Sequence, residues 1–212
     1  MKTSLLVTLC SLCFVLSCGK DTMGDEFQEK QEVQGNQETD GYYETTLIPL
    51  NTQVAGSPTG YFRFRIAGDS VTVSGDVQNT PATFHRQYIH TGSNCPGPGA
   101  DNDLDGNISF DESLFITGGA LLPLDSDLSS QSRGNSFPIA GALGNYTYTA
   151  STSLGRMLAD LESEDPKPDD FLVKLESDEN LNLSGRTLVI YGIRSDNSFP
   201  IACGTILRSE QR

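Results

Sequence analysis

The 212-residue sequence has few of the residues that several common classes of protein require. It contains 14 Lys and Arg against 28 Asp and Glu, so its formal net charge at pH 7 is −14. Phosphate backbones repel a chain this acidic, which argues against nucleic acid binding. The sequence has only two histidines, and it shows no Ser/His/Asp arrangement, glycine-rich phosphate loop or spaced pair of carboxylates. We therefore expect a non-catalytic protein.

Long apolar runs are also scarce. The run from Leu5 to Leu16 follows Lys2 and is too short to cross a bilayer as a helix. A positive charge followed by a short apolar core predicts a secretory signal peptide at residues 1–17. The run ends in Val-Leu-Ser-Cys-Gly at residues 15–19, which resembles the lipobox of bacterial lipoproteins. That resemblance implies that Cys18 becomes the lipid-bearing first residue. An ordinary cleaved signal that leaves Cys18 unmodified is the alternative.

The next segment, residues 18–41, is rich in Gln, Glu and Asp and almost without aliphatic residues. This composition predicts a disordered acidic tether. Residues 42–212 have the length of one domain. We expect the domain to be held in the bacterial cell envelope through its lipid anchor, at the outer membrane on its periplasmic or surface face. The sequence does not name a protein or glycan partner.

The five cysteines divide into three groups on this interpretation. Cys10 and Cys13 leave with the signal peptide, and Cys18 carries lipid. Cys95 and Cys203 remain, in a compartment that permits disulfides. We predict that they pair. The chain-entropy model gives about 4–5 kcal/mol for closing a loop of about a hundred residues.

The domain's pattern is mostly that of short strands. Tyr61–Ile66 and Ser70–Ser74 alternate with period two around a Gly68-Asp69 turn, which predicts a hairpin. Further strand segments are expected at Phe84–Thr91, Leu114–Ile116, Tyr146–Thr149, Phe171–Leu175, Thr187–Ile193 and Ile201–Leu207. Only Leu154–Leu161 has a helical apolar face. We predict an all-β sandwich or barrel with long loops and one short helix.

Residues 101–112 have the spacing of a twelve-residue calcium loop. Gly106 lies at position 6, where the chain must turn sharply, and Ile108 is the apolar residue at position 8. The candidate calcium ligands are Asp101, Asp103, Asp105, Asn107, Ser109 and Glu112. The alternative is a solvated, Asp-rich surface turn. The Pro- and Gly-rich residues 94–100 cannot form the leading helix of an EF-hand, so we expect a structural calcium site rather than a sensor.

Three segments together resemble a copper/zinc superoxide dismutase: residues 71–75 leading into 85–90, residues 185–191 and residues 201–206. The resemblance implies a Greek-key β-sandwich and a disulfide from Cys203 to the loop after the first segment. It does not carry the chemistry across. His90 matches the second histidine of the family's His-x-His pair, but Tyr88 stands in place of the first. Tyr191 replaces another copper ligand, and Pro200 replaces the anion-guiding arginine.

Dismutase activity is therefore not expected. His85 and His90 lie five residues apart on a predicted strand and should point to opposite faces. A metal-handling protein with a residual copper site at His90 and Tyr88 or Tyr191 is one alternative function, and a calcium-dependent adhesin is another. In the dismutase family, zinc and the disulfide order the long loop in this region. Our hypothesis is that calcium orders it here.

Overall fold

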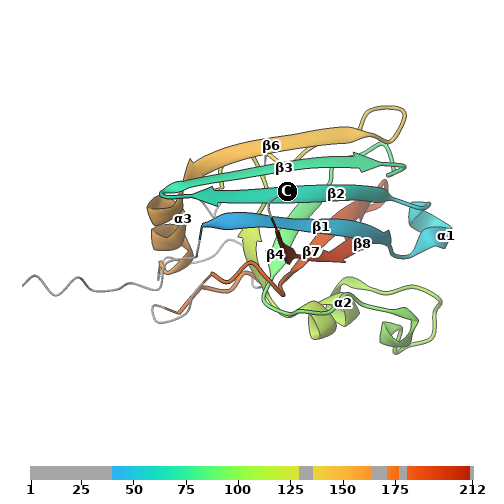
Figure 1. Cartoon of the computed structure of the whole chain (residues 1–212). Coiled ribbons are helices and arrows are strands. Elements are labelled where there is room, and N and C mark those ends of the chain that lie inside the picture. Colours follow the sequence, from blue (N-terminus) through green and yellow to red (C-terminus); the bar gives the residue numbers. More distant parts are fainter. Residues whose placement is uncertain (1–39, 129–135, 164–170, 177–180, 211–212) are drawn as a thin grey trace, which may run out of the picture. The chain divides into compact units, whose positions relative to one another are not determined.

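The computed structural model of the chain describes residues 40–128, 136–163, 171–176 and 181–210. These residues form a nine-stranded sheet with the strand order β5-β4-β7-β8-β1-β2-β3-β6, and β9 pairs with β1 (Figure 1). All ladders between the named strands are antiparallel. The strands are β1 (Gly41–Pro49), β2 (Thr59–Ala67), β3 (Ser70–Gln78), β4 (Arg86–His90), β5 (Ala120–Pro123), β6 (Tyr146–Ser153), β7 (Thr187–Ile193), β8 (Asp196–Thr205) and β9 (Leu207–Ser209).

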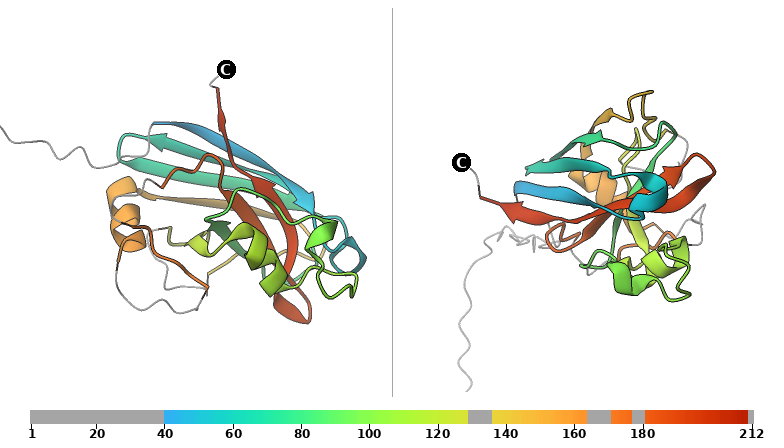
Figure 2. Two further views of the ribbon diagram at one scale, coloured as in Figure 1. Left: turned by 90° about the horizontal axis from the view of Figure 1, so that it is seen from below. Right: turned by 90° about the vertical axis from the view of Figure 1, so that its right-hand side faces the viewer.

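Strand β1 joins the two halves of the sheet. Its residues 41–47 pair with β2, and Ile48 and Pro49 pair with β8. The sheet is curled, as the views in Figure 2 show. Buried residues from both halves form a common core. We call β1, β2, β3 and β6 the β2–β3 half, and β4, β5, β7 and β8 the β4–β7 half. The predicted all-β class, sandwich-like or barrel-like, is confirmed at this level.

In the β2–β3 half, the alternation of apolar and polar residues in the sequence matches the alternation of buried and exposed side chains. Phe62, Phe64 and Ile66 of β2 are buried, whereas the residues between them are exposed. Ala67 pairs with Ser70 around the two-residue turn, where Gly68 has a φ of 57°. Glycine accepts this left-handed conformation without steric cost, and the predicted hairpin is confirmed.

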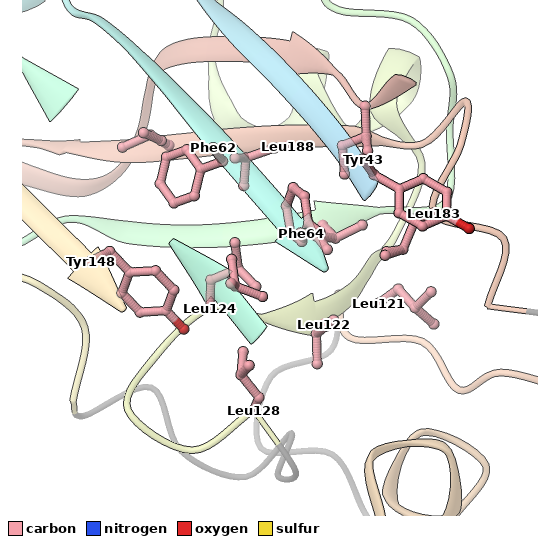
Figure 3. Packing of buried hydrophobic residues seen from close by; sticks show 14 of the residues in the cluster. Tyr43, Phe62, Phe64, Leu121, Leu122, Leu124, Leu128, Tyr148, Leu183 and Leu188 are labelled. Atoms are coloured by element: carbon pink, nitrogen blue, oxygen red, sulfur yellow. The ribbon is translucent and has the colours of Figure 1, made fainter. Parts of the chain in front are cut away.

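The β4–β7 half is buried on both faces, as the burial of six of the seven residues of β7 indicates. On the inner face, Leu188 and Ile190 meet the core supplied by β2 and by residues 121–128, as Figure 3 shows for Leu188. On the outer face, Val189 and Tyr191 belong to a second apolar cluster. This second cluster lies under the chain segment that contains the predicted calcium loop.

The helices are α1 (Thr52–Ala55), the 3₁₀ turn η1 (Pro98–Ala100), α2 (Phe110–Thr117) and α3 (Leu154–Leu161). The predicted helix at Leu154–Leu161 is confirmed, and Ser153 caps its first turn. The strand expected at Leu114–Ile116 is wrong, because these residues belong to α2. At Phe171–Leu175 the described residues form an isolated bridge between Leu172 and Ala120 instead of a strand.

Helix α2 forms for a local reason. Ser109 and Glu112 make a reciprocal capping box, in which each side chain accepts a hydrogen bond from the other residue's backbone N–H. That box satisfies two N–H groups which the first turn of a helix leaves unpaired. Among the described residues, no helix has the length and apolar composition needed to cross a membrane.

Candidate metal site

The predicted calcium loop follows η1, ends in the first turn of α2 and is attached to the sheet at two points. Cys95, six residues before the loop, forms a disulfide with Cys203 of β8. The predicted pairing is confirmed, and the two cysteines are 108 residues apart in sequence. Figure 1 shows the loop and α2 together on one side of the sheet, away from α3.

The second attachment is made by Asn51, which lies two residues after the end of β1 and directly before α1. Its amide oxygen accepts a hydrogen bond from the Ile108 N–H at 2.7 Å, and its amide nitrogen donates to the Ile108 carbonyl at 2.8 Å. The same nitrogen also donates to the Pro200 carbonyl at 2.9 Å. Asn51 has a φ of 51°, a left-handed conformation that asparagine tolerates better than most residues. Position 8 of the loop is therefore held in a fixed place against β1 and β8.

Three of the six predicted ligands converge. Carboxylate oxygens of Asp101, Asp103 and Asp105 lie within 4.8 Å of one another. Each of these side chains also accepts a backbone hydrogen bond inside the loop. Gly106 N–H donates to Asp101 Oδ2 at 3.0 Å, the Asp105 N–H to Asp103 Oδ1 at 3.2 Å, and the Asn107 N–H to Asp105 Oδ1 at 2.8 Å. These bonds orient the three carboxylates and leave each with another oxygen.

The other oxygen of Asp101 is the most informative atom of the loop. Asp101 Oδ1 is buried and has no hydrogen-bond partner among the described residues. A buried carboxylate oxygen without a donor loses its hydration and gains nothing in return. Its neighbours are two further carboxylates, which repel it. A hard cation among the three aspartates would supply the missing partner and offset the repulsion.

Ser109 and Glu112, two of the predicted ligands, are hydrogen-bonded to each other, and Glu112 also bonds to the loop backbone. Glu112 Oε2 accepts from the Ser109 N–H at 2.8 Å and from Ser109 Oγ at 2.9 Å, and Oε1 accepts from the Asn102 N–H at 2.6 Å. The hydrogen bond from the Ser109 backbone is the main cause that lowers the pKa of Glu112, and the bond from Asn102 adds to it. Glu112 therefore joins the start of the loop to the start of α2, and it is ionised at neutral pH.

The loop backbone is strained at one exposed residue. Leu104 has a φ of 62° and is 85% exposed, and Gly106 follows with a φ of 87°. A branched apolar residue rarely adopts the left-handed conformation, and such strain is often found where a loop is shaped around a ligand.

Aromatic rings fill the space beside Tyr88, His90 and Tyr191, the three positions of the possible copper site. Phe137 and Phe171 lie 5.2 and 5.4 Å from Tyr88, measured between ring centroids. Phe110, the first residue of α2, lies 5.6 Å from Tyr191. Helix α2 thus contributes Phe110 to the aromatic cover of the outer face of the β4–β7 half, and Phe137 and Phe171 come from other segments.

Both ring nitrogens of His90 have partners. Nδ1 donates to the Gly118 carbonyl at 2.8 Å, and Nε2 accepts from the Tyr191 hydroxyl at 3.0 Å. Burial lowers the pKa of His90 to about 4, although the bond to Gly118 partly opposes this shift. Burial also raises the pKa of Tyr191. His90 is therefore a neutral core histidine, and a copper ion at either nitrogen would have to displace an existing hydrogen bond.

His85 lies elsewhere. It stacks on Tyr146 of β6, with the ring centroids 5.5 Å apart, and its ring nitrogens face the carbonyls of Pro81 and Tyr191. Burial lowers its pKa, and these two contacts oppose the shift. The two histidines are thus in separate surroundings and do not form a common metal site.

The sequence gives a signal for the capping box of Ser109 and Glu112 but none for the contact between Asn51 and Ile108. The Ser-x-x-Glu pattern at Ser109 and Glu112 signals a helix start, but we assigned both residues to the metal. Nothing local marks Asn51 as a partner of Ile108, because the two are 57 residues apart. The predicted signal peptide, Cys18 and the tether before Asp40 lie outside the described residues. No protein-family model matches the chain, and no curated protein matches it in sequence.

Proposed function

We propose that this chain is a calcium-binding, non-catalytic lipoprotein of the bacterial cell envelope, in which the ion holds the loop at residues 101–112 against the sheet. The observation that carries the proposal is the buried, unpartnered Oδ1 of Asp101 beside the carboxylates of Asp103 and Asp105. Among the described residues, these three carboxylates form no ion pair with Lys or Arg. A divalent cation with oxygen ligands is the group that this donor set fits.

The contacts of the loop support a structural role for the ion. The last three residues of the loop form the first turn of α2, which places Phe110 against Phe171 and Tyr191. The loop is preceded by the three-residue turn η1 instead of a long helix. Because there is no pair of helices to open, an ion bound here stabilises the cover of the β4–β7 half and has no groove to expose.

The dismutase-like Greek-key fold remains part of the proposal. The strand order supports it, because β7 returns to lie beside β4 after β5 and β6, and β6 lies beside β3. In a Greek key, a fourth strand returns by a long connection to lie beside the first of three consecutive antiparallel strands, and here β8 lies beside β1 in the order β8-β1-β2-β3. The engaged nitrogens of His90 and the aromatic rings around Tyr88 support a fold without the family's copper chemistry.

The membrane anchor rests on the sequence around Cys18 alone. Extracellular calcium modules bind with dissociation constants of about 10⁻⁴ to 10⁻³ M. An exported domain can therefore fill such a site without high affinity.

Thermal unfolding with calcium and with chelator tests the proposal at matched ionic strength. Matching is needed because added salt also screens the net charge of −14. With a dissociation constant of about 10⁻⁴ M, about 10 mM free calcium should stabilise the fold by about 2.7 kcal/mol. For a domain of this size that is a rise in Tm of roughly 5–10 °C.

Two single-charge variants make a matched pair. Asp103→Asn keeps an oxygen that can accept the Asp105 N–H but removes one charge from the triad. Asp111→Asn removes one charge from the exposed first turn of α2. We expect Asp103→Asn to lose most of the calcium-dependent rise in Tm and Asp111→Asn to keep it. An unchanged Tm in the parent protein, or equal losses in both variants, would overturn the proposal. Metal analysis of the same preparation tests the copper alternative.

A further inference from the structure

Strand β6 lies at one end of the strand order, at the rim of the sheet (Figure 1). All eight of its residues pair with β3. Within the described residues, no other backbone hydrogen bond from Tyr146–Ser153 is found. Successive N–H groups of a strand point to opposite sides, so every second N–H and C=O of β6 faces away from β3. The outer edge is therefore a row of backbone donors and acceptors.

Within the part of the chain that the structure describes, this edge has none of the usual protection. Its sequence, Tyr-Thr-Tyr-Thr-Ala-Ser-Thr-Ser, contains no charged residue and no proline. Natural edge strands are commonly short, bulged, charged or covered, because an unprotected edge pairs with other strands. The opposite end of the sheet differs. There, Ala120 of β5 exchanges hydrogen bonds with the backbone of Phe171 and Val173, at 3.0 and 2.9 Å.

We propose that the outer edge of β6 pairs with β6 of a second copy of this chain, so that the two sheets become continuous. A strand from another protein would gain specificity through pockets for alternate side chains. The exposed side chains on β6 are only Thr147, Thr149 and Ser151, and the inward-facing Tyr146 and Tyr148 are buried in the protein's own core. The edge thus offers a partner backbone groups and short hydroxyl side chains, which an identical strand matches.

The charge of the chain also favours this edge as the contact. Two copies with a net charge of −14 repel each other, and an uncharged strand lets them meet without placing like charges opposite each other. A two-fold axis perpendicular to the sheet pairs residues of the same face. The hydroxyl residues of the two copies then lie across from one another, and such Thr–Thr and Thr–Ser pairs are favourable in sheets.

Sedimentation equilibrium of the full chain tests the inference. We expect a monomer–dimer equilibrium in the parent protein, and Thr149→Lys should weaken dimerisation at least tenfold by placing like charges across the new strand pair. Ser74→Lys is the matched control, because Ser74 lies on β3 in the interior of the sheet, paired on one side with Thr149 and on the other with β2. It adds the same charge and should leave the dimer unchanged. Circular dichroism checks that each variant is folded.

Hydrogen exchange shows whether a second copy of the chain or a segment of the same chain covers the edge of β6. In a β6-paired dimer, alternate amides of residues 146–153 should be protected at high protein concentration and exchange faster on dilution. A parent protein that stays monomeric at the highest concentration reached would overturn the proposal. So would protection that does not depend on concentration, or a dimer that Thr149→Lys leaves intact. Calcium binding does not enter this test, so its outcome is independent of the proposed function.

Discussion

Stability between pH 7 and pH 5 should depend on His90. Burial lowers the pKa of His90 from 6.5 to about 4 in the folded protein, whereas the unfolded chain keeps the ordinary value. The unfolded state then binds a proton at a higher pH than the folded state does. The contribution of His90 to the free energy of unfolding is therefore fully present above about pH 7. It decreases as the pH drops through 6.5 and stops decreasing below about pH 4.

The size of the effect follows from the shift. A change of one pKa unit corresponds to about 1.4 kcal/mol. Lowering the pH from about 7 to below 4 therefore reduces the free energy of unfolding by about 3 kcal/mol. About 2 kcal/mol of this is lost between pH 7 and pH 5. Most Asp and Glu side chains remain ionised at pH 5 in both states, because their ordinary pKa values lie near 4. The loss between pH 7 and pH 5 therefore reports mainly the histidines.

Urea unfolding at several pH values, followed by circular dichroism, measures this slope in the parent protein and in His90→Asn. The asparagine amide can still donate to the Gly118 carbonyl but does not titrate. The variant should be less stable than the parent protein at pH 7, since the Tyr191 hydroxyl loses its acceptor. Its stability should nevertheless fall less between pH 7 and pH 5, by about 2 kcal/mol.

His85 provides the control. It is the only other histidine in the chain, and burial lowers its pKa as well. A double variant, His85→Asn with His90→Asn, should remove the histidine-dependent slope completely. If His90→Asn falls as steeply as the parent protein, or if the His90 ring protons titrate near pH 6.5 by NMR, the assignment of His90 as a neutral core residue is wrong.

Three further predictions concern the contacts of the loop. Replacing Cys95 and Cys203 together by serine should lower the free energy of unfolding by about 2–5 kcal/mol in urea unfolding, and an unchanged midpoint would contradict a stabilising disulfide. Phe110→Ala should cost about 2 kcal/mol, less than the 3–5 kcal/mol of a fully buried phenylalanine, because Phe110 is only partly buried; a cost within 0.5 kcal/mol of zero would show that α2 is not packed on Tyr191. Ser109→Ala should cost about 1 kcal/mol in the presence of chelator, since it removes the cap of α2; a loss seen only with calcium would make Ser109 a ligand instead.

Much of the fold could be predicted from local patterns. The alternation in Tyr61–Ile66 and Ser70–Ser74 predicts the β2–β3 hairpin, and the apolar face of Leu154–Leu161 predicts α3. Helix α2 was missed because its start signal, Ser109 with Glu112, coincides with the last positions of the calcium motif. Strand β5 was missed because four residues are too few to show a period.

The candidate site divides in the same way. The Asp-x-Asp-x-Asp-Gly spacing predicts that the three aspartates converge, because a turn of a few residues brings them together whatever lies around it. The attachment of Ile108 by Asn51 has no local signal, since the two residues are 57 positions apart in the chain.

The sequence alone determined the strand-rich class, the hairpin, helix α3, the pairing of Cys95 with Cys203 and the position of the acidic loop. These features depend on short-range periodicity, on turn chemistry or on the number of cysteines. Only the tertiary structure decided that His90 is a neutral core residue held by Gly118 and Tyr191, and that β6 is the last strand in the order of the described sheet. Burial and strand order are properties of the whole chain, and no local pattern encodes which distant side chains will desolvate a histidine or which strand will come last in the sheet.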